Sequence, residues 1–363
     1  MDNTLIEKIM RDYYDNIRVE DIIEKYGLTI KKSQILSLFP LLESDELCPY
    51  CSKPLVAKRP SRSASKNHIN IYYCKSCGHR NDDFCNCNGC QAKRQEAINK
   101  SKELIKSTFS KQPQINLQDL SFEDLINLGA LCHGKLSPES TVLLPIGENT
   151  MLTPDSAWDR KLIDSLLDKG AISVSGMSNV SAFDTNDFPN SFYIKRVCFD
   201  VNLAPNDIKL IIDGELPDLS IGSNLLSIKN LLRLINKYLI LRYLLTSLRE
   251  VNLSFSPGAK TDTLINTMLD HFSLAQSLYA IKKCVGEGLL DYKEENIYRK
   301  HAANRIIAHL INYTNSAIEN NYKPCCLRYR PNNLKESLLE QYLIYNLLNI
   351  NNSFTQPLNE LLS

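Results

Sequence analysis

Residues 48–90 read CPYCSKPLVAKRPSRSASKNHINIYYCKSCGHRNDDFCNCNGC and contain seven of the chain's twelve cysteines. Two Cys-x2-Cys pairs, Cys48 with Cys51 and Cys74 with Cys77, are separated by 22 residues. Four thiolates at about 2.3 Å complete the tetrahedron that Zn²⁺ accepts in a closed structural site. The spacing of the two pairs therefore predicts a zinc site.

The residues next to the two pairs favour the same interpretation. Pro49 and Gly78 stand where each Cys-x2-Cys knuckle must bend tightly, and Tyr72 and Tyr73 lead into the second pair like a strand. This pattern resembles a zinc ribbon, over about 45 of the 363 residues. The resemblance implies a small metal-stabilised module and no particular activity.

Three further cysteines follow the second pair and extend the metal chemistry beyond an ordinary ribbon. Cys85, Cys87 and Cys90 supply three thiolates, and His79 is the nearest candidate for a fourth ligand, with His68 as the second candidate. We therefore expect two Zn²⁺ ions, the second in a Cys3His site. In the alternative, one Zn²⁺ binds four of the seven sulfurs and the other sulfurs are spare.

The predicted metal has a structural role. A catalytic zinc keeps an open position and uses His and carboxylate ligands, whereas Asp82 and Asp83 are the only carboxylates of this segment. The segment also has few large apolar residues, too few to fold alone. Each metal would supply folding free energy on the order of 10 kcal/mol or more, so chelation should unfold this part first.

Compartment and membrane topology follow from the cysteines and from hydropathy. Thiolate ligands must stay reduced, and the other five cysteines show no disulfide spacing, so we expect a cytoplasmic protein. Met1 to Asp21 lack the apolar core of a signal peptide. The most apolar stretch, Leu231 to Leu248, is interrupted by charged residues, which argues against a membrane span.

The net charge of +1 conceals an asymmetry. Residues 48–111 contain 13 basic and four acidic residues, a formal +9, whereas the other 29 basic and 37 acidic residues give −8. Two Zn²⁺ on seven thiolates would reduce the positive figure to about +6. The cysteine-rich segment is the basic pole of the chain, and we expect nucleic acid as its partner.

The basic residues form two sets that favour contacts with phosphates. One set lies between the two Cys-x2-Cys pairs, in residues 58–66, which we call the ribbon loop; it comprises Lys58, Arg59, Arg62 and Lys66. The other set follows the last cysteine and comprises Lys93, Arg94 and Lys100. A solvated loop and a solvated helix face explain the same charges. Because both sets lie on or next to the predicted zinc module, we favour phosphate binding over a merely solvated surface.

Upstream of the ribbon, residues 19–39 read as two short helices around a turn at Gly27. This order resembles a helix-turn-helix, a motif that places its second helix in the major groove of DNA. A plain helical hairpin that docks on the ribbon explains the pattern equally well.

Downstream, Thr153 and Pro154 precede an expected helix from Asp155 to Asp168, with Thr153 as its cap, and Gly170 ends it. Strands are expected at residues 172–174 and 192–201. Helix, glycine, strand, loop and strand follow the order of winged-helix domains, which residues 117–203 resemble. The expected wing, residues 175–190, is acidic, so it favours a structural or protein-docking role over contact with DNA.

The remaining sequence predicts helices at 225–248, 263–285, 294–320 and 333–349, with breaks at Pro257-Gly258, Gly286 to Gly288 and Pro324. Short links between such helices imply a bundle. His301, Arg305 and His309 recur every four residues and share one helical face. This arrangement resembles the motif of the all-helical HEPN ribonucleases, with Arg305 and His309 one residue closer than in that motif. A polar stripe is the interpretation we favour.

The sequence thus predicts a multi-domain, mainly α chain with small β parts. Its expected segments are a helix-turn-helix-like helical segment (1–46), a zinc ribbon with an extra cysteine cluster (47–92), a basic linker helix (93–113), a winged-helix-like domain (114–205) and a helical bundle (206–363). We expect a zinc-containing nucleic-acid-binding protein rather than an enzyme. The alternatives are a protein-interaction adaptor that binds its partner through the bundle, and a bacterial defence effector with a ribonuclease-like C-terminal domain.

Overall fold

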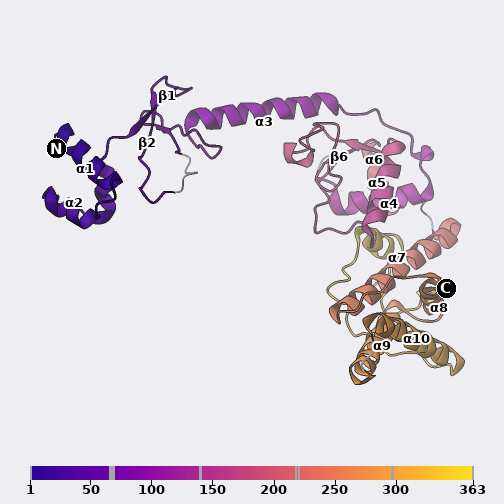
Figure 1. The fold of residues 1–363 in the computed structure, drawn as a ribbon. Coiled ribbons are helices and arrows are strands. Elements are labelled where there is room, and N and C mark those ends of the chain that lie inside the picture. The colour runs from indigo at the N-terminus through magenta and orange to yellow at the C-terminus, as the bar shows by residue number, and fades with distance from the viewer. Residues whose placement is uncertain are drawn as a thin grey trace. The chain divides into compact units, whose positions relative to one another are not determined.

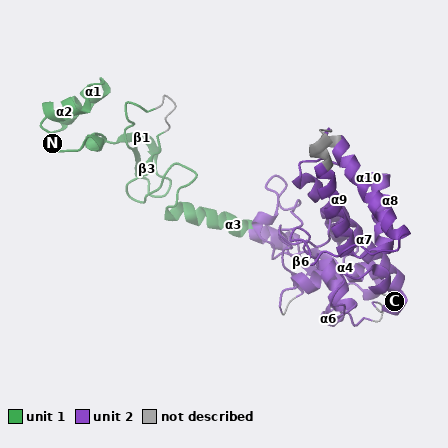
Figure 2. Cartoon of the chain, turned by 90° about the horizontal axis from the view of Figure 1, so that it is seen from below, with its two compact units in different colours: residues 1–101 green, residues 102–363 purple. Residues whose placement is uncertain are grey.

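The computed structural model describes residues 2–64, 70–138, 141–216, 219, 221–295 and 298–361. Its elements divide between two units, unit 1 over Met1–Ser101 and unit 2 over Lys102–Ser363 (Figure 2). Helices dominate the chain, and the described strands form two small sheets of three strands each (Figure 1). The predicted class, a multi-domain and mainly α chain with small β parts, is confirmed.

Unit 1 begins with a helical segment around a small core of its own. Helix α1 (Asn3–Tyr14), which the sequence analysis did not predict, packs against α2 (Val19–Lys25). Gly27 has a φ of +59° and ends α2 as expected. The second expected helix is present as the 3₁₀-helix η1 (Lys32–Leu38) rather than as an α-helix. Pro40 holds the residue before it in an extended conformation, so little room remains for a longer helix.

The sheet of unit 1 joins the two Cys-x2-Cys knuckles. Strand β1 (Leu42–Leu47) pairs antiparallel with β2 (Pro54–Ala57), which pairs antiparallel with β3 (Tyr73–Cys74). The strand expected at Tyr72 and Tyr73 is thus present at the second knuckle. The small cluster around this sheet buries Leu55 with the sulfur-bearing side chains of Cys48 and Cys74. So small an apolar cluster contributes little folding free energy by itself.

Helix α3 (Asn88–Thr108) begins five residues before the expected basic helix. Residues 91–100 are all exposed, and Ile105 is the buried residue of the helix. The pairs Glu96–Lys100 and Gln95–Asn99 connect side chains four residues apart. Over residues 91–100 the helix gains no packing energy from a core, so the stability of this part depends on such pairs and on what holds the two ends of the helix.

Unit 2 opens with η2 (Leu117–Asp119) and α4 (Phe122–Lys135), followed by a mixed α and β part. This part contains β4 (Val142–Leu143), α5 (Ser156–Asp168), β5 (Ile172–Val174), η3 (Val180–Ala182), β6 (Phe199–Val201) and α6 (Pro205–Asp213). The strands form an antiparallel sheet in the order β4-β6-β5. Strand β6 is therefore the central strand.

Two local expectations in this part need correction. The second strand is shorter than expected, because the N–H groups of Arg196 and Val197 turn back to the carbonyl oxygen of Tyr193. Helix α5 is capped by Asp155, whose Oδ1 accepts from the N–H groups of Ala157 and Trp158. Thr153 lies further upstream and donates its hydroxyl to Asp159 instead.

The rest of unit 2 is helical. Its elements are α7 (Ile221–Glu250), α8 (Ala259–His271), α9 (Leu274–Glu295), α10 (Arg299–Glu319), α11 (Leu338–Gln341), the π-helical η5 (Tyr342–Leu347) and α12 (Leu358–Leu361). One hydrophobic cluster runs from Ile105 to Leu358, so these helices and the β4-β6-β5 part share a core. None of the described helices has the length and apolar character that a membrane crossing requires.

Two expectations about the helix boundaries are wrong. The single helix expected at 263–285 is divided, because Ser273 and Gln276 exchange hydrogen bonds that start α9 anew. No break occurs at Gly286 to Gly288, where α9 continues. A Cβ at Gly288 would lie 2.3 Å from Ile306 of α10, so this glycine allows α9 and α10 to lie side by side (Figure 1).

Candidate metal centres

Each Cys-x2-Cys pair of unit 1 lies on a knuckle with the same backbone hydrogen bonds. In the first knuckle, Ser52 N–H donates to the Cys48 carbonyl oxygen and Cys48 N–H donates to the Lys53 carbonyl oxygen, at 2.9 and 2.8 Å. In the second, Gly78 and Cys74 donate in the same pattern, at 2.9 and 2.7 Å. Because both knuckles have this geometry, the two cysteine sulfurs of each knuckle point toward the same place.

The residue after each second cysteine has a positive φ, +53° at Ser52 and +70° at Gly78. The tight bend expected at Gly78 is present. In the first knuckle the bend lies at Ser52 and not, as expected, at Pro49. Serine rarely adopts the left-handed conformation, so its type carried no signal. The knuckle geometry, rather than the residue type, requires this conformation.

We predict that Gly78→Ala weakens metal binding by the four cysteines of the two knuckles by about fivefold. The alanine Cβ would meet nothing within 4 Å, so the cost is the left-handed backbone alone, about 1 kcal/mol. Ser52→Gly removes the same cost and should bind zinc at least as tightly as the unaltered chain. Competition with a chromogenic chelator measures both affinities, and equal affinities for Gly78→Ala and the unaltered chain would contradict the prediction.

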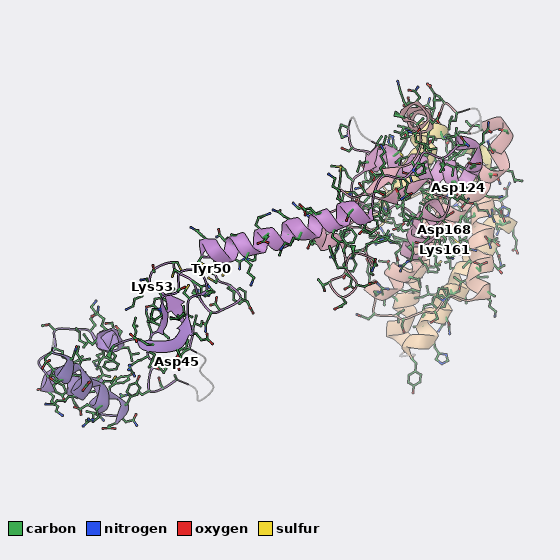
Figure 3. The ribbon with its side chains drawn as sticks, turned by 90° about the horizontal axis from the view of Figure 1, so that it is seen from above. Asp45, Tyr50, Lys53, Asp124, Lys161 and Asp168 are labelled. Atoms are coloured by element: carbon green, nitrogen blue, oxygen red, sulfur yellow. The ribbon has the colours of Figure 1, made fainter. Side chains whose placement is uncertain are left out.

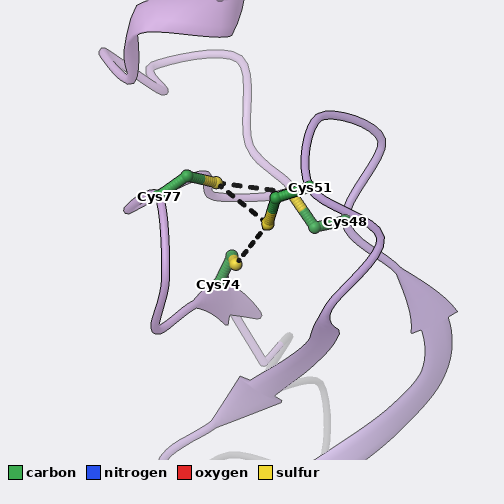
Figure 4. Close-up of side chains that lie close together, drawn as sticks. All are labelled: Cys48, Cys51, Cys74 and Cys77. Atoms are coloured by element: carbon green, nitrogen blue, oxygen red, sulfur yellow. Dashed lines mark hydrogen bonds between the residues drawn. The ribbon is translucent and has the colours of Figure 1, made fainter.

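The first candidate centre is formed by Cys48, Cys51, Cys74 and Cys77 (Figure 4). Their sulfurs lie 3.4 Å apart for Cys48–Cys77, 3.3 Å for Cys51–Cys74 and 3.7 Å for Cys51–Cys77. A tetrahedron with Zn–S bonds of about 2.3 Å has edges of about 3.8 Å. These sulfurs are too far apart for disulfides and nearly as far apart as zinc ligands, so the residues fit the metal.

The second candidate centre is formed by His79, Cys85, Cys87 and Cys90. The Nδ1 atom of His79 lies 3.5, 3.7 and 3.4 Å from the sulfurs of Cys85, Cys87 and Cys90, in that order. The predicted pair of ligand groups is therefore confirmed among the described residues, consistent with two Zn²⁺. His68, the second candidate for the histidine ligand, lies outside the described residues.

Backbone N–H groups stabilise thiolates in both centres before any metal binds. The N–H of Cys77 is the main cause that lowers the pKa of Cys74 to about 6. The N–H groups of Cys87 and Arg80 lower the pKa of Cys85 to about 6 as well. Each centre thus offers one ligand that is already ionised near neutral pH, which is the form that binds metal.

Helix α3 is attached to the second centre at its N-terminus. Cys87 Sγ accepts from the N–H of Cys90 in the first turn, at 3.4 Å. Arg94, one turn further, donates to the Cys85 carbonyl oxygen at 2.6 Å and to Asn86 Oδ1 at 3.2 Å. A metal held by His79, Cys85, Cys87 and Cys90 would therefore fix the start of α3, whose residues 91–100 are all exposed.

Tyr50 connects the two centres. It belongs to the first knuckle, yet its hydroxyl donates to Cys90 Sγ at 3.3 Å and its ring meets the His79 ring edge to face at 5.1 Å. The bond to Cys90 raises the pKa of Tyr50 to about 12, so the phenol remains a donor. A Cβ at Gly89 would lie 2.4 Å from the Tyr50 ring, so only glycine fits beneath it. Tyr50 was not predicted from the sequence, because the spacing of the cysteines gives no sign of its role.

We predict that Tyr50→Phe lowers metal affinity at the second centre by about tenfold and leaves the first centre unchanged. The variant keeps the ring over Gly89 but loses the donor to Cys90, and such outer partners commonly contribute 10–100-fold to affinity. Co²⁺ titration followed by visible absorption distinguishes four sulfur ligands from three sulfurs and one nitrogen. Tyr72→Phe is the matched control, and equal Co²⁺ affinities for Tyr50→Phe and Tyr72→Phe would refute the prediction.

Both candidate centres have the composition of structural sites. Each has four protein ligands, and neither group includes a carboxylate. With four protein ligands a tetrahedral ion has no position left for a substrate. Bound Zn²⁺ would supply cross-links, while the chain's own residues set the knuckles, the thiolates and the start of α3.

The predicted phosphate contacts differ in their surroundings. Arg59 donates to the Pro40 carbonyl oxygen at 2.8 Å, and Arg62 donates to the carbonyl oxygens of Tyr13 and Ile17 at 3.2 and 2.5 Å. Arg62 also lies over the Tyr13 ring. Arg62 thus joins the ribbon loop to the end of α1, and Arg59 joins it to Pro40, between η1 and β1.

The lysines among the predicted contacts are exposed wherever they are described. Lys58 lies on the ribbon loop and Lys93 on α3, both exposed, and Lys66 lies outside the described residues. Lys100 is exposed and pairs with Glu96 at 2.7 Å. Surface pairs of this kind are worth about 1 kcal/mol or less and exchange readily for another anion.

The HEPN-like set lies on α10 in unit 2. His301 is exposed, whereas Arg305 and His309 are partly buried and have interactions within the chain. The ribonuclease hypothesis stays a prediction, which cleavage assays on Arg305→Ala and His309→Ala can test. Comparison of the chain with protein-family models, with curated proteins and with solved structures gave no match.

Proposed function

We propose that the chain binds nucleic acid through the lysines of α3, which a zinc-ribbon module of unit 1 holds in place. The observation that carries the proposal is the exposed, basic α3 directly attached to a candidate metal centre. Its residues include five basic and two acidic side chains. Contacts between lysines and phosphates position a protein on nucleic acid without sequence preference.

The spacing of the α3 lysines favours a double-stranded partner. At 100° per residue, Lys93 and Lys100 share one side of the helix, and Lys102 and Lys106 lie roughly 180° away. A helix in the major groove of DNA has a phosphate backbone on each side. Two opposed rows of lysines supply contacts to both backbones, so we infer duplex DNA as the preferred form.

Arg59, Arg62 and Arg94 support this surface indirectly. Their guanidinium groups already donate to carbonyl oxygens within unit 1, so we assign them to positioning the ribbon loop and α3. Lys58 remains a candidate contact from the ribbon loop. The order α5, Gly170, β5, loop and β6 supports the winged-helix-like interpretation, and we assign that part a structural role because of its acidic loop.

The test is a titration of labelled duplex DNA, single-stranded DNA and RNA with the zinc-loaded full chain. We expect the tightest binding to duplex DNA, its loss after chelation, and its recovery when Zn²⁺ is restored. Chelation should abolish binding because α3 loses the anchor of its first turn. Failure to bind all three nucleic acids would refute the proposal.

An adaptor role is the second candidate, and one observation favours it. Unit 1 exposes several large apolar side chains, with exposed fractions of 83% for Phe84, 58% for Leu47 and 48% for Ile71. Exposed apolar residues of this size are common in surfaces that bind other proteins. Recovery of a stoichiometric protein complex without nucleic acid would favour this role.

A further inference from the structure

Unit 2 contains a cavity of about 1060 Å³ whose lining residues all lie between Lys111 and Ile212. Helices α4 and α6 and strands β4 and β6 contribute to it, and Ile208 and Leu136 supply apolar wall. Its volume suffices for a small molecule, since ligand pockets commonly measure about 300–1,000 Å³. The winged-helix resemblance of residues 117–203 covers most of these residues but predicts no ligand for them.

The cavity contains a buried carboxylate without a partner. Asp200 lies on the central strand β6 between the core residues Phe199 and Val201, so its side chain emerges on the opposite face of the sheet. It is 9% exposed, lines the cavity, and has no hydrogen bond or ion pair to any residue that the structure describes. Among the described residues its carboxylate oxygens are not enclosed atoms, so they face the cavity, where a ligand can supply N–H groups to them.

Cationic and donor groups line the same cavity. Lys111 and Lys209 are exposed, and the described residues give neither of them an ion pair. Asn346 Nδ2 lies 3.2 Å from His133 Nδ1 and also donates to the Ile212 carbonyl oxygen at 3.4 Å. An amide nitrogen only donates, so His133 Nδ1 is the acceptor of this contact. The cavity thus combines one buried carboxylate with two lysines and a histidine.

This combination restricts the ligand. The two lysines require an anionic group, the apolar walls favour a flat ring, and Asp200 requires an edge with two adjacent N–H donors. A polyamine would be repelled by the lysines, and adenine offers an acceptor beside its amino group. Guanine presents N1–H and its 2-amino group side by side. We propose that this cavity binds a guanine nucleotide, with the base at Asp200 and the phosphate at Lys111 and Lys209.

The inference goes beyond the proposed function, because it concerns residues of unit 2 alone and a small molecule. Two sources present the same guanine edge to the cavity: a free guanine nucleotide and a guanine base in a single strand of nucleic acid. Calorimetric titration of the zinc-loaded full chain with GMP, IMP, AMP and spermidine tests it. A second series with two short single strands, differing by one guanine or adenine, distinguishes the two sources.

We expect GMP to bind, IMP to bind on the order of tenfold more weakly because it lacks the 2-amino donor, and AMP to bind more weakly still. Asp200→Asn should remove the preference for GMP over AMP. Lys209→Gln, an exposed substitution that should leave folding unaffected, should weaken GMP but not guanosine. Equal binding of GMP and AMP, binding of spermidine, or no binding of any nucleotide would overturn the proposal. If Asp200→Asn does not fold, the series of ligands and the Lys209→Gln variant still test it.

Discussion

Removal of the metal ions should unfold the part of unit 1 that contains the two candidate metal centres and leave unit 2 folded. Around strands β1 to β3 the apolar cluster is small, and two of its members are cysteine ligands. Each structural zinc contributes folding free energy on the order of 10 kcal/mol or more, far above what such a cluster supplies. Unit 2 has one extensive core from Ile105 to Leu358, and both candidate metal groups found among the described residues lie in unit 1. Hydrogen exchange with and without a chelator measures the protection of backbone amides in strands β1 to β3 and in unit 2 in one experiment.

Single substitutions should separate the two centres. Cys51→Ser should release both zinc ions, because His79 of the second centre directly follows the second knuckle and Tyr50 directly precedes Cys51. Cys87→Ser should release one ion and leave the first centre intact. Cys326→Ser, at an exposed cysteine of unit 2, is the control. Unchanged protection of β1 to β3 after chelation, or full zinc content in Cys51→Ser, would show that the metals are not structural.

Charge reversal on α3 should abolish most of the affinity for duplex DNA. Three substitutions, Lys93→Glu, Lys100→Glu and Lys102→Glu, would remove three phosphate contacts from exposed positions. Each contact accounts for about 0.9 of the slope of log affinity against log salt, so three contacts at 0.1 M salt are worth roughly 10²–10³-fold. The slope should fall by about 2.7.

The matched control changes the net charge by the same amount elsewhere. Lys161, Lys260 and Lys335 are exposed lysines of unit 2, and Lys161 lies on α5 (Figure 3). Their replacement by glutamate should lower affinity only slightly, through the weaker long-range field. If both triple variants lose affinity equally, binding depends on net charge and not on α3.

The metal ligands were predictable because their chemistry is local in sequence. Few combinations of two cysteine pairs, three further cysteines and a nearby histidine give two groups of four ligands. His79 lies in the second group, as expected. The conformation of Ser52 was not predictable, since nothing in a serine indicates a positive φ. Tyr50 was not predictable either, because its partner Cys90 belongs to the other centre.

Charge and glycine patterns were less reliable guides, because both depend on partners distant in sequence. Arg62 is basic and lies in a loop, yet its guanidinium contacts carbonyl oxygens at the end of α1. Gly288 was read as a helix break, whereas its missing side chain allows Ile306 of α10 to approach. Asp200 and Lys209 meet in one cavity with His133, a set that no local motif unites.

The most direct test of the central claim is the affinity of the zinc-loaded full chain for duplex DNA across a series of salt concentrations. The account predicts a linear fall of log affinity with log salt and a slope of about −3 to −4, as contacts from four lysines of α3 require. A slope near zero would mean that phosphates are not bound. That result would contradict the account and leave the metal centres as supports for a protein-binding surface.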